Sequence, residues 1–284
     1  MKRPEFNINH ILNNKSISGE HWMTNLSPLL RQLPLIYLCI PGTIESKRSN
    51  ITLQLFNGIR YLHISTYKYK RNWLCSPDVK LYDVLRQISL FGVCHPNEII
   101  FIELKIISQF YNEIECLNII IQRLLPLLMT KTTNEFWISK LSINSICNTG
   151  KNIILINNKY AHRNERIFSS CTKYICTSSI NKLDHLLNQV PSSICSTYQI
   201  PQFSIKIMWC VKSKFDFMKC VTHKLVTLSR NTIIDYVTNS DKNITNLNKI
   251  SIFCIECGDD GNCGDYCIDV LYLCMQIMEQ RFFQ

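Results

Sequence analysis

Apolar positions along this chain follow two alternating patterns. Short runs rich in β-branched residues alternate with longer segments whose apolar residues recur at helical spacing, which is typical of strand–helix units around a parallel sheet. The predicted strands are Leu35–Ile40, Ile59–Ser65, Ile99–Leu104, Asn152–Ile156, Phe203–Val211 and Ile250–Glu256, with a weaker candidate at Tyr174–Thr177. A chain with this order of elements closes most naturally as an α/β barrel of the TIM type, regular or incompletely closed.

Two segments show clear helical spacing. Apolar residues recur at helical intervals from Leu81 to Ile88, and Pro96 ends that segment. The second helix is predicted over residues 265–281, with Leu271 and Met275 on its inward face. The chain has 284 residues, 46% apolar and 18% charged, and no linker-like tract interrupts it. We therefore predict one domain over residues 1–284, with a helical lead-in over residues 1–30.

Charge and hydropathy restrict the location and the partners. The amino terminus lacks the apolar region of a signal peptide, and the longest apolar stretch, Leu117–Met129, is too short and too polar to span a bilayer. The sequence predicts a cytoplasmic protein without a transmembrane segment, able to lie at membrane surfaces. Its net charge of +10 favours anionic surfaces, and the absence of nucleic-acid-binding motifs favours phospholipid over nucleic acid. The odd count of 15 cysteines favours reduced thiols.

Several segments, in order, carry a family resemblance. They are LPLIYLCIPGTIES from residue 33, GIRYLHIS from residue 58, HPNEIIFIEL from residue 95, GKNIILINN from residue 150 and NKISIFCIE from residue 248. Together they resemble the X domain of phosphatidylinositol-specific phospholipase C, in its small X-domain-only branch. The resemblance implies a TIM-type barrel that acts as a phosphoric diester hydrolase on phospholipids.

The same resemblance implies that the catalytic motifs are degenerate. The family's first catalytic histidine falls on Ile44, and the acid after it survives only as Glu45. The acid and the arginine of the second-strand motif fall on His63 and Ser65, and the second histidine falls at Trp73 or the next residue. Each general acid or base typically contributes about 10²–10⁴-fold to the rate. The sequence thus favours the fold and argues against the ordinary reaction.

Strand alternation predicts which side chains share a face. It places Tyr61, His63 and Ser65 on one face of their strand, and the resemblance makes that face the barrel interior. The same parity points Glu103 and Glu256 toward the mouth of the barrel. The mouth is therefore expected to be polar.

This mouth has two interpretations. One is a divalent-cation site for Ca²⁺ or Mg²⁺, since carboxylates with one histidine suit such ions. Its candidate ligands are Glu45, His63, Glu103 and Glu256. The other, which the sequence favours, is a mouth without a cofactor, whose acids pair with Lys105 or with backbone donors.

The segment after the second strand, Thr66–Trp73, mixes cations with aromatic rings. Lys68, Lys70, Arg71 and Trp73 are the candidate lipid-surface contacts, because cations attract anionic headgroups and aromatic rings suit the membrane interface. The alternative is an ordinary solvated loop with one or two rings packed on the barrel. A carboxyl-terminal group of cysteines between Cys254 and Cys274 suggests zinc, but its irregular spacing favours buried thiols.

Two functional hypotheses remain. The leading one is a catalytically impaired pseudoenzyme that binds a phosphoinositide-containing membrane or a protein partner. The alternative is an active metal-assisted phosphodiesterase that cleaves phosphatidylinositol to diacylglycerol and inositol phosphate, with His63 or Glu45 as the base. A scaffold that never meets lipid is a third possibility.

Overall fold

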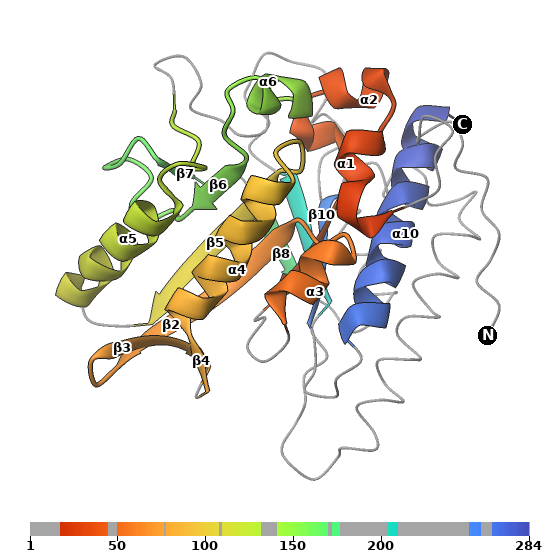
Figure 1. The fold of residues 1–284 in the computed structure, drawn as a ribbon. Helices are drawn as coiled ribbons and strands as arrows, with labels where there is room; N and C mark the ends of the chain where they lie inside the picture. The colour runs from red at the N-terminus through yellow and green to blue at the C-terminus, as the bar shows by residue number, and fades with distance from the viewer. Residues whose placement is uncertain are drawn as a thin grey trace, which may run out of the picture.

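The protein is a mixed α/β barrel built on parallel strands (Figure 1). The computed structural model describes residues 18–44, 50–76, 78–107, 110–131, 141–169, 172–176, 204–209, 250–256 and 263–283. The parallel strands are β1 (Ile40–Ile44), β2 (Tyr61–Tyr69), β5 (Ile100–Ile107), β6 (Ile153–Ile156), β7 (Ile167–Phe168), β8 (Thr172–Cys176), β9 (Ser204–Trp209) and β10 (Ile250–Glu256).

The order of these strands is that of a TIM-type barrel. The sheet runs β7-β6-β5-β2-β1-β10-β9-β8, so neighbours in the sequence are neighbours in the sheet and β10 returns to β1. Within the described residues no pairing joins β7 to β8. The predicted fold class is confirmed, and the missing pairing is consistent with the incomplete closure that the prediction allowed.

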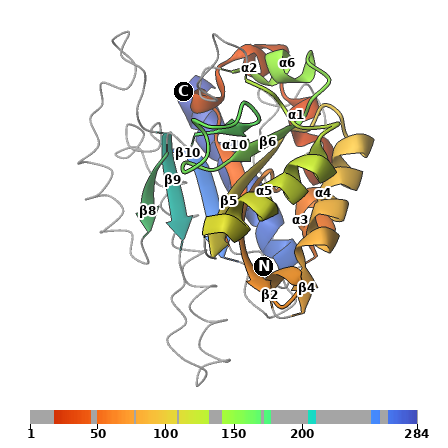
Figure 2. The ribbon, with the colours of Figure 1, turned by 90° about the vertical axis from the view of Figure 1, so that its left-hand side faces the viewer.

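Helices cover the outside of the sheet and one of its ends. They are α1 (Trp22–Asn25), α2 (Pro28–Gln32), α3 (Ile51–Phe56), α4 (Leu81–Cys94), α5 (Phe110–Leu124), α6 (Ile143–Cys147) and α10 (Cys263–Phe283), with 3₁₀ turns η1 (Gly19–His21) and η2 (Leu35–Tyr37). Figure 1 shows α1, α2 and α6 at one end of the barrel and the β3–β4 hairpin at the other. In the turned view of Figure 2, α3, α4 and α5 lie on one side and β8 and β9 on the opposite side.

The core between α4 and the sheet follows from the sequence pattern. The helix buries Leu81, Val84, Leu85 and Ile88, which recur at helical spacing, as predicted. These side chains share one apolar cluster with residues at even positions of β2 and β5, namely Leu62, Ile64, Ile102 and Leu104. Burying each such side chain contributes roughly 1.5–3 kcal/mol. The odd positions of both strands are thereby left to the interior of the barrel, as strand parity predicts.

A buried ion pair fixes the amino-terminal segment against the barrel. Arg60 and Glu98 are fully buried, with 2.7 Å between Nη2 and Oε2. Arg60 also donates to backbone carbonyls of η1, of α3 and of the residue that precedes Arg60. Glu98 accepts from Met23 N and from Thr24 N and Oγ1. The two charges are therefore fully hydrogen-bonded, which buried charges require.

The first strand lies later in the chain than predicted. Leu35–Tyr37 forms a 3₁₀ turn, and the strand is Ile40–Ile44. The residues before it are apolar because the segment passes through the core, where Leu35 and Leu38 are buried. Burial without a pairing partner does not make a strand, whereas Ile40–Ile44 pairs with both β10 and β2.

The predicted loop over Thr66–Trp73 is a β-hairpin. Strand β2 continues to Tyr69, and Tyr69 pairs with Asn72 across a tight turn into antiparallel β3 (Asn72–Ser76). A short strand, β4 (Val79–Lys80), pairs with β3 in turn. Lys70 in the turn adopts a left-handed φ of 54°.

Candidate functional site

Backbone pairing places the predicted mouth residues on one level of the sheet. Ile44 pairs with Glu256 on one side and with His63 on the other, and His63 pairs with Glu103. Glu103 in turn pairs with Ile156. The residues that strand parity singled out on β2 and β5 are therefore direct neighbours.

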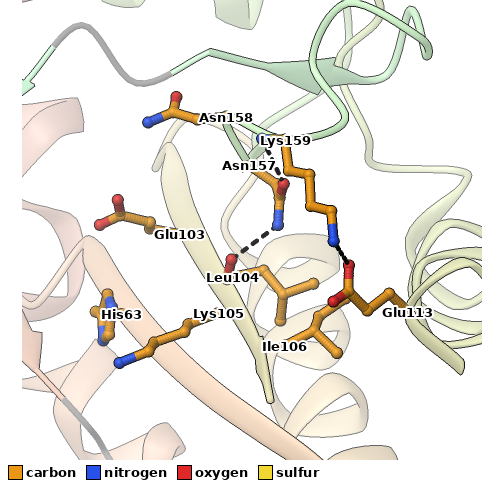
Figure 3. A pocket seen from close by; sticks show the side chains of 9 residues that line it. All are labelled: His63, Glu103, Leu104, Lys105, Ile106, Glu113, Asn157, Asn158 and Lys159. Carbon is orange, nitrogen blue, oxygen red and sulfur yellow. Dashed lines mark hydrogen bonds and ion pairs between the residues drawn. The ribbon is translucent and has the colours of Figure 1, made fainter. Parts of the chain in front are cut away.

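Beside this row lies a cavity of about 390 Å³ at the carboxyl ends of β2, β5 and β6. Figure 3 shows the side chains that line it, most of which are polar. They are His63, Glu103, Leu104, Lys105, Ile106, Glu113, Asn157, Asn158 and Lys159. The carboxyl ends of the strands are where TIM barrels hold their active sites, so this cavity is the candidate site.

Glu103 is held inside the barrel by its neighbour on β2. Tyr61 Oη donates to Glu103 Oε2 over 2.7 Å, and the Tyr61 ring stacks on Phe101 with 6.3 Å between centroids. A neutral phenol bound to a carboxylate leaves the negative charge in place. Glu103 is thus a fixed, buried acid at the wall of the cavity.

A second acid on the wall, Glu113 of α5, is paired. Lys159 Nζ and Tyr160 Oη each lie 2.6 Å from Glu113 Oε2. Burial acts to raise the pKa of Glu113, but hydrogen bonds from Lys159 and Tyr160 outweigh it and lower the pKa. The hydrogen bond to Glu113 raises the pKa of Lys159, so this pair stays ionised at neutral pH.

The loop after β6 is shaped by one asparagine. Asn157 Nδ2 donates to Leu104 O over 3.0 Å, and Asn157 Oδ1 accepts from the backbone N–H groups of Lys159 and Tyr160. Asparagine commonly builds turns by bonding backbone groups two residues on. This turn carries Lys159 to the rim of the cavity, where it meets Glu113 (Figure 3).

Lys105 is the second lysine of the cavity wall. In Figure 3 its side chain reaches toward His63 along the cavity wall. Its residue is exposed, and among the described residues its ammonium has no ion-pair partner. Of the acids predicted to pair with Lys105 or with backbone donors, Glu103 accepts instead from the side chain of Tyr61.

Other predicted site residues are placed as follows. Ser65 lies on the interior face and is buried, with no hydrogen-bond partner for its Oγ among the described residues. Glu45 lies outside the described residues, and Glu256 is placed by its register alone. The predicted Ca²⁺ or Mg²⁺ site that would need both of them stays a prediction.

The predicted lipid-contact residues divide into two groups. Trp73 is only 7% exposed, and Lys68 pairs with Glu115 over 2.5 Å, so both make internal contacts. Lys70 and Arg71 form the exposed turn of the hairpin. The alternative of a ring packed on the barrel therefore holds for Trp73, and the turn remains the candidate for lipid contact.

The carboxyl-terminal cysteines lie on different elements. Cys254 is on β10, and Cys267 and Cys274 are buried on α10. Cys257 lies outside the described residues. The two cysteines whose burial the structure describes, Cys267 and Cys274, agree with the buried thiols that the sequence favours.

The sequence analysis missed Glu113, Asn157 and Lys159 as wall residues. Glu113 lies on α5, and the direction of its side chain depends on how that helix packs against the sheet. Its only sequence signal is its position in the first turn of the helix that follows β5. The sequence LINNKY after β6 was a usable signal, since asparagines at the end of a barrel strand indicate a built turn.

Comparison with solved structures identifies the fold. A structure of phosphatidylinositol-specific phospholipase C from Listeria monocytogenes is similar with a TM-score of 0.61 at 15% identity, over 90% of this chain and 99% of that one. The chain has the fold of phosphatidylinositol-specific phospholipase C. Two structures of that phospholipase from Staphylococcus aureus give TM-scores of 0.58 and 0.55 at 14% and 13% identity, over 89% of this chain and 96% and 97% of theirs.

No protein-family model matches the sequence, and no curated protein matches it. At these identities the phospholipase C likeness shows the fold alone. In the part of the chain that the structure describes, none of the helices is both long enough and apolar enough to cross a bilayer.

Proposed function

We propose that this protein binds the phosphate-bearing headgroup of an anionic phospholipid in the cavity at the carboxyl ends of β2, β5 and β6, without ordinary phospholipase C turnover. The observation that carries the proposal is the position of Lys105, a cation with no ion-pair partner among the described residues, beside the level at which Ile44 pairs with His63.

The charges of the cavity admit an anionic ligand. Two lysines, Lys105 and Lys159, balance the two acids, Glu103 and Glu113, so the wall has no excess of negative charge that would repel an anion. Lys105 has no ion-pair partner among the described residues, and lysine is a common partner of phosphate groups. The protein's net charge of +10 favours an anionic membrane surface around the site.

The proposal that turnover is absent rests on the resemblance to the phospholipase C X domain. The position that it assigns to the first acid/base histidine is Ile44, which can neither donate nor accept a proton. The position that it assigns to the phosphate-contacting arginine is Ser65. Without a base on the attacking hydroxyl and a cation on the phosphoryl oxygens, the transition state loses its main stabilising groups.

We further propose that the whole chain is one domain and acts in the cytoplasm at membrane surfaces. The exposed turn with Lys70 and Arg71 follows the carboxyl end of β2, one of the strand ends at which the cavity lies, so it can approach the membrane that presents the headgroup.

The test is sedimentation with phosphatidylcholine vesicles that do or do not contain phosphatidylinositol or a phosphoinositide. Lys105→Ala is expected to reduce phosphoinositide-dependent binding several-fold. Lys151→Ala is the matched control, because Lys151 Nζ bonds Pro126 O at the start of β6, at the other end of the barrel. Equal binding by wild type and Lys105→Ala would contradict the proposal.

A second candidate is the metal-assisted phosphodiesterase. It is favoured by the row in which His63, Glu103 and Glu256 lie with Ile44 on one level of the sheet, on adjacent strands. Release of inositol phosphate from labelled phosphatidylinositol that needs a divalent cation and is lost in His63→Ala would establish it. Absence of turnover with every divalent cation tried would leave binding alone.

A further inference from the structure

A group of three metal-ligating side chains lies at the opposite end of the barrel from the cavity. Glu20 and His21 come from η1, and His95 follows the carboxyl end of α4. One ligand atom from each lies within 4.8 Å of the other two. His95 Nε2 is 2.7 Å from Glu20 Oε1, and His21 Nε2 is 3.9 Å from the same oxygen.

His95 is oriented like a metal ligand. The residue is 7% exposed, and its ring stacks on Phe91 with 4.1 Å between centroids. Its Nδ1 lies 2.9 Å from Phe91 O. A carbonyl oxygen only accepts, so Nδ1 carries a proton and Nε2 is the ring atom that faces Glu20. The 2.7 Å contact there is a hydrogen bond from Nε2 to the carboxylate, and a metal ion would replace its proton. Metal-bound histidines commonly donate their other N–H to a carbonyl in this way.

The backbone that carries the other two ligands is fixed. Arg60 Nη2 donates to the carbonyls of Gly19 and Glu20 over 2.9 and 2.8 Å. The side chains of Glu20 and His21 are 35% and 48% exposed, so they can adjust around an ion. A rigid backbone with adjustable ligand side chains lowers the ordering cost of binding.

We propose that Glu20, His21 and His95 bind a divalent first-row transition metal of the Zn²⁺ type, with water completing the coordination. Two imidazoles and one carboxylate suit Zn²⁺, whereas Mg²⁺ and Ca²⁺ prefer oxygen ligands. Tetrahedral bonds of about 2.0–2.2 Å place ligand atoms about 3.3 Å apart. The contact between His95 and Glu20 opens slightly and His21 swings in when the ion binds.

Such an ion would fasten the amino-terminal segment to the barrel. Two ligands belong to η1 and the third to the residue after α4, so the metal joins His95 to Glu20, 75 positions earlier in the chain, and to His21, 74 positions earlier. An ion that binds only the folded chain stabilises it by mass action. The site is independent of the proposed headgroup cavity, so either can fail without the other.

The probe is Co²⁺, added to the full-length chain after treatment with a chelator. Co²⁺ in a site of nitrogen and oxygen ligands gives visible d–d bands without the thiolate charge-transfer band that binding by any of the 15 cysteines would add. We expect one equivalent to bind with this spectrum, to be displaced by Zn²⁺, and to raise the midpoint of thermal unfolding.

His21→Ala is the decisive variant, because the side chain is exposed and its loss leaves the core intact. Loss of even an outer-shell partner typically weakens metal affinity about 10–100-fold, so loss of this ligand should weaken it at least tenfold. His162→Ala removes an exposed histidine elsewhere and is the matched control. Glu20→Gln should behave like His21→Ala. Unchanged affinity in His21→Ala, a thiolate band, or no binding by wild type would each overturn the site.

Discussion

Arg60 and Glu98 show how one pair of side chains can organise the end of a barrel. Burial lowers the pKa of Arg60, and the Glu98 charge opposes that shift. Arg60 Nη1 bonds the carbonyls of Leu55 and Ile59, which keeps the chain between α3 and β2 in place. The pair therefore matters less as an attraction between charges than as a set of satisfied hydrogen bonds.

Glu98→Ala should destabilise the protein by about 3–5 kcal/mol, because it leaves the Arg60 cation buried without its partner. The free energy of unfolding in urea measures this. Glu165→Ala removes the acid of an exposed pair with Arg166 and should cost less than about 1 kcal/mol. Similar losses in the two variants would contradict the role of the buried pair.

Glu113 is expected to make stability depend on acid pH. Its folded pKa is lowered from the ordinary value, so the folded state favours the ionised carboxylate. Its contribution is present above the unfolded pKa of about 4.3 and is lost as the pH falls through the lower folded value. The difference in stability between wild type and Glu113→Gln should therefore be largest near neutral pH and shrink below about pH 4. Denaturant titrations from pH 7 to pH 3 measure it, and a difference independent of pH would argue against the assignment.

Among the secondary-structure elements, the hairpin of β2 and β3 was the least expected. Its polar residues read as a solvated loop, although Tyr67 and Tyr69 alternate with Lys68 and Lys70 in the period of a strand. Thr66 Oγ1 donates to Leu74 O over 3.0 Å within the hairpin. Alternation among polar residues is a strand signal that a search for apolar runs overlooks.

Two substitutions in the turn of this hairpin can distinguish an effect on stability from an effect on surface charge. Lys70→Gly should raise stability by up to about 1 kcal/mol, since glycine adopts the φ of 54° without the steric cost that lysine has. It should also weaken binding to anionic vesicles, because a cation is lost. Arg71→Gly removes the same charge at an ordinary φ and should weaken binding without any gain in stability. Urea titration and vesicle sedimentation are read together, and a stability gain in both variants would contradict the conformational explanation.

Elements that have a local signal in the sequence were predictable, and elements whose conformation comes from pairing with distant segments were not. Ile250–Glu256 and the start of α4 at Leu81 match the predictions because an apolar run and a helical period are local signals. Ile40–Ile44 was missed because Pro41 and Gly42 indicate a turn. Its strand conformation comes from pairing on both sides. In the site, strand parity predicted that His63 and Glu103 face the interior of the barrel. The position of Lys159 could not be predicted, because its partner Glu113 is placed by the packing of α5.

At the scale of the whole molecule, the two ends of the barrel have different chemistry. Helices α1, α2 and α6 cover the end near the start of the strands, where Trp22 and Leu30 are buried (Figure 1). The other end has the polar cavity and the hairpin. In TIM barrels the first kind of end serves stability and the second serves function.

If the proposed function is right, one added imidazole should not produce phospholipase C activity. Ile44→His places an imidazole on the level of His63, but Ser65 supplies no charge for phosphoryl oxygens. Catalytic groups that act as a unit contribute little singly. Assays with labelled phosphatidylinositol should show no turnover above wild type, whereas a large gain would mean that the rest of the site is already competent.

The bonds between the amino-terminal segment and Glu98 also bear on how the chain folds during synthesis. Met23 and Thr24 reach their acceptor only after 75 further residues have been made, and Arg60 also depends on it. The first helices therefore cannot complete their contacts while they leave the ribosome. Until residue 98 has emerged, apolar side chains of this segment that are buried in the folded barrel, such as Trp22, lack part of their cover, and transiently exposed apolar surface is prone to aggregation.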